Sequence, residues 1–194
     1  MRAKLCIIIL CLNALFLTGC RSSRKIETAS IVENVSISEE NGGICYTFYV
    51  LSGSDKPKGY RIQADTFEKA RELAENEYIP NMSLSKLELL MIEDSLIDRV
   101  LKTDIEYIST QPSFSPTAFV TLCDRETTVK FAEKTDVQDL IEKQLILLKK
   151  NNPGISINYL SVFNRFESAK TKEFTVGYVT SENGLKISEK NIAK

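Results

Sequence analysis

The sequence predicts a single α/β (α+β) domain in which a mixed sheet of about five to seven strands is flanked by helices. Two apolar, strand-like segments at residues 87–92 and 118–122 are separated by a helical pattern, which favours parallel strands joined by a crossover helix. Turn signals at Asn41-Gly42-Gly43 and Asn183-Gly184 each join β-rich segments. Hairpins are therefore expected at both ends of the domain.

The first β-rich region is expected to form one of these hairpins. Residues 29–37 place branched apolar side chains on one face, and residues 44–51 are rich in aromatic and β-branched side chains. Residues 60–64 are expected to add a short strand. A helix then follows, capped by Asp65 with Glu68 as the reciprocal partner of a capping box, and Pro80 ends it. Its apolar stripe consists of Phe67, Ala70, Ala74 and Tyr78.

The crossover unit occupies the middle of the chain. Residues 87–92 have few polar positions, so this strand is expected to be central in the sheet. Ser95 and Asp98 suggest a second capping box for the helix that follows. The apolar face of that helix consists of Leu96, Ile97, Val100 and Leu101. A loop at residues 112–116 leads into the second apolar strand.

The last third of the chain contains two expected helical regions and a hairpin. Residues 126–134 look helical, and a clearer helix runs from residue 135 or 136 to Lys150, before the stop signal Asn151-Asn152-Pro153-Gly154. The expected inner face of this helix consists of Val137, Leu140, Ile141, Gln144 and Leu148. Residues 155–168 fit either a helical or a strand period. Phe174, Val176 and Tyr178 alternate into a strand, which a short partner around residues 185–187 follows.

The first residues have the pattern of a secretory signal. Arg2 and Lys4 precede an apolar run over residues 5–17 that only Asn13 interrupts. The run is too short for a membrane-spanning helix, which needs about 20 apolar residues. It is followed by Leu17-Thr18-Gly19-Cys20, which places small residues before an expected cleavage site.

The sequence Leu17-Thr18-Gly19-Cys20 resembles the bacterial lipobox. The resemblance implies that Cys20 receives a diacylglyceryl thioether and becomes the N-terminus after cleavage. The acyl chains would then hold an otherwise soluble chain on a membrane. The expected organisation is a lipoprotein signal peptide at residues 1–19, a lipidated tether at 20–27 and one α/β domain at 28–194. There are two alternatives for this segment: an ordinary signal peptide followed by an incidental cysteine, or an uncleaved anchor.

Composition excludes several classes of function. The first 19 residues contain two basic and no acidic residues, so the remainder carries 25 − 2 = 23 basic and 26 acidic residues, a net charge of −3. This mild negative charge argues against a nucleic-acid partner. The chain has no histidine, which removes Ser-His-Asp and Cys-His catalysis and His-based zinc sites. No cofactor or metal is expected.

Residues with chemical potential are few and scattered. Ser83 and Lys86 have the spacing of a Ser-x-x-Lys acyl-enzyme motif, but their segment leads directly into a strand and the partner motifs of that class do not occur. The acidic residues of the central region are better explained as caps and a charged face than as a metal or acid-base site; they are Glu93, Asp94, Asp98, Asp104 and Glu106. The sequence therefore predicts a protein that is not an enzyme.

Cys45 and Cys123 are the cysteines that remain beyond Cys20. Each lies in an apolar, strand-like segment, so buried free thiols are favoured over a disulfide. An exported protein would nevertheless permit a disulfide if the two strands were suitably placed.

The order of the sequence blocks resembles the N-terminal domain of Ger(x)C lipoproteins, the C subunits of spore germinant receptors. The blocks that carry the resemblance are the lipobox and short polar tether, the strand at residues 29–32, Phe67-Glu68-Lys69-Ala70, Lys86-Leu87-Glu88-Leu89-Leu90-Met91-Ile92-Glu93-Asp94-Ser95-Leu96, and Thr117-Ala118-Phe119-Val120-Thr121-Leu122. The chain departs from the family at Arg21, where a Trp is usual, and near Lys86, where a His is frequent. The family also continues into further domains beyond the position of Lys194.

The resemblance implies a mixed sheet flanked by helices, no known catalytic residues, and a lipid anchor on the extracytoplasmic face of the cell membrane. It also implies docking on polytopic germinant-receptor-like membrane subunits, so the first hypothesis is an assembly or accessory subunit of such a complex. The alternative is a general envelope lipoprotein, either a solute-binding or an adaptor module, and an enzyme is a distant third. The helical region at residues 126–150, with its Lys- and Glu-rich polar face, is the candidate docking surface.

Overall fold

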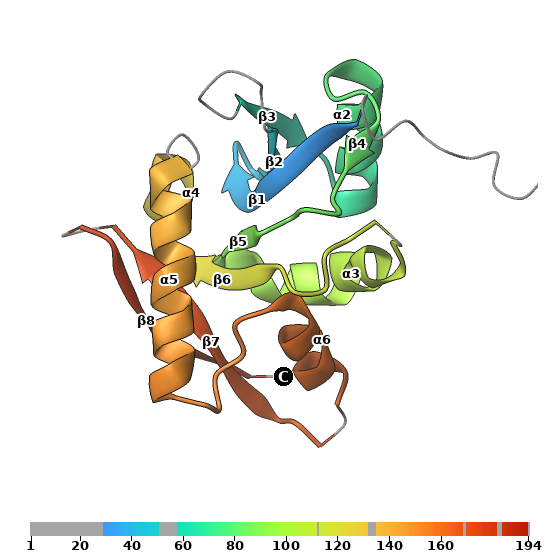
Figure 1. Ribbon diagram of the computed structural model, residues 1–194. Helices are drawn as coiled ribbons and strands as arrows, with labels where there is room; N and C mark the ends of the chain where they lie inside the picture. Colours follow the sequence, from blue (N-terminus) through green and yellow to red (C-terminus); the bar gives the residue numbers. More distant parts are fainter. Residues whose placement is uncertain are drawn as a thin grey trace, which may run out of the picture.

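The computed structural model describes residues 29–50, 58–111, 113–131, 135–168, 170–181 and 184–193. These residues form an eight-stranded sheet with the order β3-β2-β1-β5-β6-β7-β8, and β4 pairs with the start of β1 (Figure 1). The strands are β1 (Ser30–Glu40), β2 (Gly43–Val50), β3 (Lys58–Gln63), β4 (Met82–Ser83), β5 (Leu89–Glu93), β6 (Phe119–Cys123), β7 (Glu173–Thr180) and β8 (Lys186–Ala193). The strand count exceeds the expected range only through the two-residue β4.

The sheet is mixed, as the sequence predicts. Strands β1, β5, β6 and β7 run parallel to one another, whereas the pairs β1–β2, β2–β3 and β7–β8 are antiparallel. The first hairpin turns at Asn41 and Gly42, which both have positive φ. The expected parallel crossover is confirmed, because β5 and β6 are adjacent, parallel and joined through a helix. The predicted α/β fold class is therefore correct.

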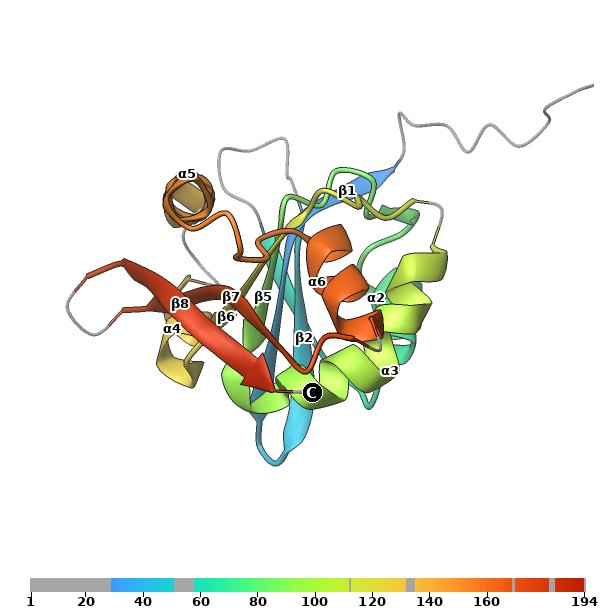
Figure 2. The ribbon, with the colours of Figure 1, turned by 90° about the horizontal axis from the view of Figure 1, so that it is seen from below.

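Helices cover both faces of the sheet (Figure 2). They are α2 (Phe67–Glu77), α3 (Ile97–Thr110), α4 (Arg125–Phe131), α5 (Thr135–Asn151) and α6 (Tyr159–Glu167), and a 3-10 turn (Asp94–Leu96) precedes α3. In Figure 2, α2, α3 and α6 lie on one side of the strands, and α4 and α5 lie on the other. The ambiguous segment before β7 becomes α6, whose first turn is closed by a capping box between Asn158 and Ser161.

Each face of the sheet has its own hydrophobic core. The larger core lies under α2, α3 and α6, and the smaller lies under α5. Strand β5 contributes to both, because Leu90 and Ile92 enter the larger core while Leu89 and Met91 enter the smaller one. A strand buried on both faces shows continuous apolar residues instead of alternation, which explains the pattern at residues 87–92.

A buried carboxyl group joins three elements of the larger core. Asp104 of α3 is 1% exposed, and its two oxygens accept hydrogen bonds from the Tyr46 hydroxyl at 2.8 Å and from the backbone N–H of Phe67 at 3.0 Å. Burial and the neighbouring carboxyl raise the pKa of Tyr46 far above its ordinary range, so this hydroxyl remains a donor. The Phe67 ring contacts the rings of Tyr46 and Phe48 edge-on. Asp104 thus ties α3 to β2 and to the first turn of α2.

The predicted cap of α2 is wrong by one residue. Thr66 is the N-cap, and its hydroxyl accepts from the backbone N–H of Lys69, so Asp65 lies outside the helix. Asp and Thr are both favoured N-cap residues, so two adjacent candidates in the sequence do not decide which one caps the helix. The sequence pattern predicts Tyr78 on the buried stripe of α2, and this is wrong. Tyr78 follows the last helical residue and is 50% exposed.

Two expectations about later helices are also wrong. Ser95 and Asp98 form no capping box, because Ser95 lies in the 3-10 turn and donates to Glu93, and α3 begins at Ile97. On α5, Leu140 is 43% exposed, and the inner position is taken by Leu145, which packs directly over Gly177 of β7. A side chain at Gly177 would collide with Leu145, so the helix can approach the sheet only over a glycine.

We predict that Asp104→Ala lowers the free energy of unfolding by about 2–5 kcal/mol, because it leaves the Tyr46 hydroxyl and the Phe67 N–H buried without an acceptor. Urea unfolding monitored by circular dichroism would measure this. The matched control is Glu106→Ala on the exposed side of the same helix, which should change stability by no more than about 0.5 kcal/mol. Equal effects of the two substitutions would contradict the role assigned to Asp104.

Candidate functional site

The structure does not bring the scattered candidate residues of the sequence together. Cys20, the expected lipidation site, and the tether lie outside the described residues. Ser83 lies on β4 with its hydroxyl 2.9 Å from that of Ser85, and Lys86 follows in the next turn, so the two residues do not share a helical turn. Ser83 and Lys86 therefore lack the arrangement that a Ser-x-x-Lys acyl-enzyme requires.

The central acidic residues have separate structural roles. Glu93 is buried and accepts hydrogen bonds from the Glu39 N–H at 2.8 Å and the Ser95 hydroxyl at 2.9 Å. Asp94 forms an ion pair with Lys190 of β8. Asp98 and Glu106 are exposed on α3. Within the described ranges, no group of three or more Cys, Asp or Glu side chains has a geometry that could hold a metal ion.

Cys45 and Cys123 are both buried and free, which confirms the expected structural thiols. The Cys123 sulfur lies 2.9 Å from the hydroxyl of Thr128, in the middle of α4. Burial raises the pKa of Cys45, and it raises the pKa of Cys123 to about 12. A thiol that stays protonated is a poor nucleophile, so neither residue has the environment of a reactive cysteine.

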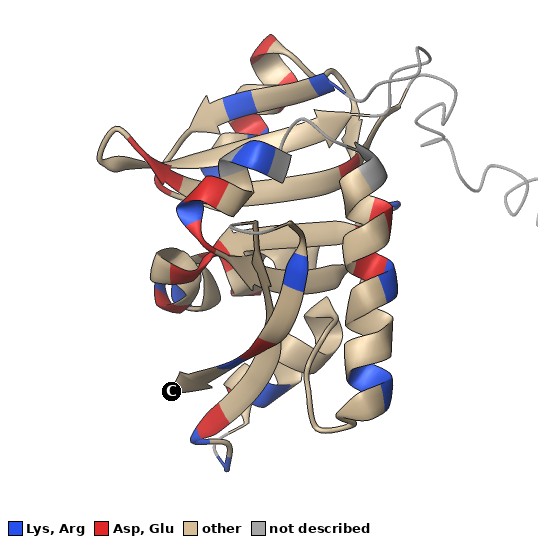
Figure 3. Ribbon diagram, turned by 90° about the vertical axis from the view of Figure 1, so that its left-hand side faces the viewer, with Lys and Arg blue, Asp and Glu red and all other residues tan. Residues whose placement is uncertain are grey.

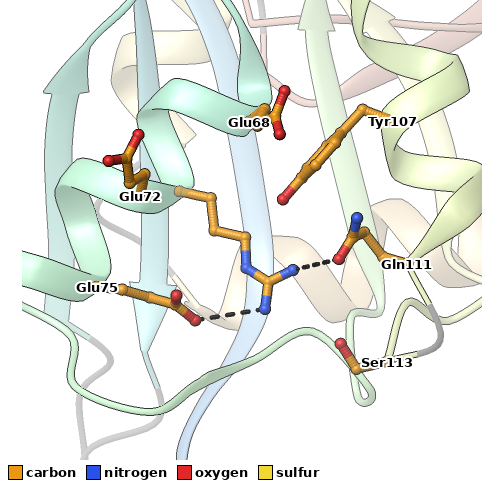
Figure 4. Close-up of a pocket in the computed structure, with 7 residues that line it drawn as sticks. Glu68, Glu72, Glu75, Tyr107, Gln111 and Ser113 are labelled. Carbon is orange, nitrogen blue, oxygen red and sulfur yellow. Dashed lines mark hydrogen bonds and ion pairs between the residues drawn. The ribbon is translucent and has the colours of Figure 1, made fainter.

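An open pocket of about 480 Å³ lies between α2 and the C-terminal end of α3 (Figure 4). Helix α2 supplies Glu68, Arg71, Glu72 and Glu75, and the α3 side supplies Tyr107, Gln111 and Ser113. Figure 4 shows the Tyr107 hydroxyl directed toward the middle of the pocket, with Gln111 and Ser113 below it. The lining of the pocket is therefore mainly polar and comes from two helices that pack against each other.

Arg71 is the centre of this pocket. It is 9% exposed, although arginine is rarely buried. Its guanidinium donates to the Gln111 side-chain oxygen at 2.9 Å and to the Glu75 carboxylate at 3.3 Å. Its Nε is buried and has no hydrogen-bond partner among the described residues. A guanidinium has five N–H donors, so the described contacts leave part of its bonding capacity unused.

Sequence reasoning missed this pocket, although a signal was present. Arg71 follows Phe67 by four residues and precedes Ala74 by three, so it lies on the apolar stripe of α2. A charged residue on a buried helical face needs a partner. That partner, Gln111, is 40 residues away along the chain and becomes visible only when α2 and α3 pack together.

A second hollow, of about 250 Å³, lies between α5 and the starts of β5 and β6. Lys86, Glu88 and Glu142 are among its lining residues. Burial, followed by repulsion from Glu88, Asp139 and Glu33, raises the pKa of Glu142 to about 7. One oxygen of Glu142 is buried and has no hydrogen-bond partner in the described chain. The hollow is therefore a place where carboxyl groups repel one another.

The predicted docking region at residues 126–150 corresponds to α4 and α5, and the outer face of α5 is exposed. Figure 3 shows charges of both signs along it, with acidic residues toward the α4 end and lysines toward the opposite end. Leu140, Ile146 and Leu147 are also exposed on this helix. The face is therefore mixed and not simply rich in Lys and Glu. Among the helices that the structure describes, none is long and apolar enough to cross a membrane.

Comparison with known families identifies one relationship. The sequence model described as the spore germination protein N-terminal domain matches residues 22–181. The match covers most of the chain and includes every described element from β1 to β7. No curated protein and no solved structure matches the chain significantly.

We predict that Cys45 and Cys123 react slowly with a thiol reagent in the folded protein, at least about tenfold more slowly than after unfolding, because both are buried with raised pKa values. The rates would be measured at pH 8, with and without urea, on a chain that begins at Arg21 so that no other thiol contributes. Rapid labelling of the folded chain would contradict the structural role, as would a mass that shows a disulfide.

We predict that Glu142→Gln stabilises the protein at pH 8 but not at pH 4. Because the folded pKa is raised from 4.5 to about 7, the protonated form is favoured in the fold, and that contribution is lost as the pH rises through this range. The expected gain at pH 8 is about 1 kcal/mol, after a discount for partial exposure. Thermal unfolding of both proteins at each pH would test this. The control is Glu106→Gln, at an exposed position of α3, which should change stability little at either pH. A gain in stability for Glu142→Gln that is the same at both pH values would refute the electrostatic origin.

Proposed function

Because the chain belongs to the family of spore germination protein N-terminal domains, we propose that it is a membrane-anchored lipoprotein that serves as an assembly or accessory subunit of a germinant-receptor-like complex. The observation that carries this proposal is the family match over residues 22–181. The proposal places the domain on the extracytoplasmic face of the cell membrane. Its partners would be polytopic membrane subunits of the same receptor.

The lipobox-like sequence supports the membrane location. Leu17-Thr18-Gly19-Cys20 follows a basic and then apolar segment, and the domain begins at β1 only ten residues after Cys20. Acylation of Cys20 would supply the membrane affinity. A tether of this length would keep the domain close to the bilayer. Confinement raises the effective concentration of the domain near a membrane partner, so a weak interface would suffice.

The side-chain arrangement supports binding over catalysis. Ser83 does not share a helical turn with Lys86, and burial raises the pKa of the Cys45 and Cys123 thiols, which makes both poor nucleophiles. The polar pocket around Arg71 holds donors and acceptors whose ordinary chemistry is recognition. We therefore propose that the domain acts by contact with its partner and does not turn over a substrate.

We predict that crosslinking of the lipidated protein in its native membrane captures receptor subunits that are embedded in the bilayer. The captured proteins would be identified by mass spectrometry. Recovery of germinant-receptor membrane subunits is the expected result. Capture of cell-wall or unrelated transport proteins alone, in a spore-forming host that expresses such receptors, would refute the receptor role and leave a general envelope lipoprotein.

Cys20→Ala is the matched control for this experiment. Without the cysteine the protein should incorporate no labelled fatty acid, remain an unprocessed precursor and lose most of its captured partners. Normal fatty-acid labelling of Cys20→Ala would refute the lipid anchor at this residue while leaving the receptor role open to the crosslinking result.

A further inference from the structure

We infer that the pocket between α2 and α3 is a docking site for a basic peptide segment of a partner protein, with Arg71 binding a main-chain carbonyl of that segment and the surrounding glutamates binding its cationic side chain. This inference rests on the proposed function, because it assigns the surface through which the domain contacts its partner. It is carried by the contacts of Arg71 and by the charges of the pocket rim.

The inner part of the pocket offers hydrogen-bond donors. Arg71 donates from one terminal nitrogen to Gln111 and from the other to Glu75, which leaves one N–H on each of these nitrogens for a further acceptor. The hydroxyls of Tyr107 and Ser113 also line the pocket, and neither forms a hydrogen bond within the described part of the chain. A ligand that satisfies this interior must bring acceptor oxygens, such as those of peptide carbonyls.

The rim of the pocket is acidic. Glu68, Glu72 and Glu75 line it, whereas Arg71 is the only basic residue among the described lining residues. Glu75 is paired with Arg71, and Glu72 is paired with Lys69 at 2.8 Å across the exposed surface of α2. An anion would meet net repulsion here, so the acceptor that reaches Arg71 should be uncharged and should be accompanied by positive charge.

A basic peptide segment satisfies both requirements at once. Its carbonyl oxygens match the guanidinium and the hydroxyls, and a Lys or Arg side chain matches Glu68 and Glu72. A small cation would leave the donors of Arg71 unsatisfied. A neutral polyol would bring no positive charge to the rim, where Glu68 forms no ion pair within the described part of the chain.

The position of the pocket suits docking to a second protein. Its walls are two helices that are joined at two points. Asp104 of α3 accepts from the backbone N–H of Phe67 at the start of α2, and Arg71 of α2 donates to Gln111, which follows α3. The pocket is therefore preorganised, which limits the entropy lost on binding. It lies on the opposite side of the sheet from α5 (Figure 2), so the two surfaces can be tested separately.

The test is site-specific photocrosslinking with the full lipidated chain in its native membrane. A benzophenone amino acid replaces Ser113 in the pocket or, in a separate protein, Lys143 on the exposed face of α5. The expected result is a crosslink from position 113 to a membrane-embedded subunit, mapped to a segment that contains Lys or Arg. Capture from position 143 alone would overturn the docking site but leave the receptor role intact, and capture from neither position would count against both.

Charge-neutral variants test the chemistry of the contact. Glu68→Gln combined with Glu72→Gln should reduce the crosslink yield from position 113 by about tenfold, as expected for the loss of two exposed ion pairs. Glu77→Gln, on the same helix but outside the pocket lining, should leave the yield unchanged. An unchanged yield in the double variant, or a crosslink to a segment without basic residues, would overturn the assignment.

Discussion

The hydrogen bonds of Asp104 hold together the face of the domain that contains the pocket. This carboxyl group lies on α3, yet it accepts from the first N–H of α2 and from a tyrosine of β2. One turn farther along α2, Arg71 reaches Gln111 at the end of α3. The two helices are thus joined at two points, and the pocket lies between them. Because the donors at Asp104 are buried, each of these contacts is costly to lose.

The two faces of the sheet are held by different forces. The face under α2, α3 and α6 has a large continuous apolar core. The opposite face is apolar under the middle of α5, where Ile141 and Leu145 belong to a core cluster with side chains of β5 and β6. Nearer β1 it becomes polar, and Asn34 of β1 donates to Gln138 of α5. Glu142 adds a carboxyl group whose pKa is raised to about 7. Helix α5 therefore packs partly through polar groups around a small apolar cluster, whereas α2 and α3 combine a large apolar core with a few buried hydrogen bonds.

Family membership and side-chain geometry address different questions about this domain. The match to spore germination protein N-terminal domains gives the biological setting but names no binding residue. The pocket around Arg71 offers a physical means of recognition, since a largely buried guanidinium with unused N–H donors lies beside an acidic rim. Together they support the proposal that the domain acts by binding. A lipid on Cys20 would attach it to the membrane, and the pocket would bind the partner protein.

The sequence by itself determined the fold class, the hairpins and the parallel crossover, because strand alternation, Asn-Gly turns and continuous apolar runs are local signals. It also supplied the lipobox-like segment before Cys20, which depends only on residues adjacent in the chain. Tertiary structure decided which of two neighbouring residues caps α2, since Thr66 and Asp65 are equivalent locally. It also placed Leu145 inside and Leu140 outside, because only a helix centred over Gly177 can approach the sheet. The pocket was likewise decided by tertiary structure. Arg71 and Gln111 are 40 residues apart, and no local sequence pattern indicates that their helices pack side by side.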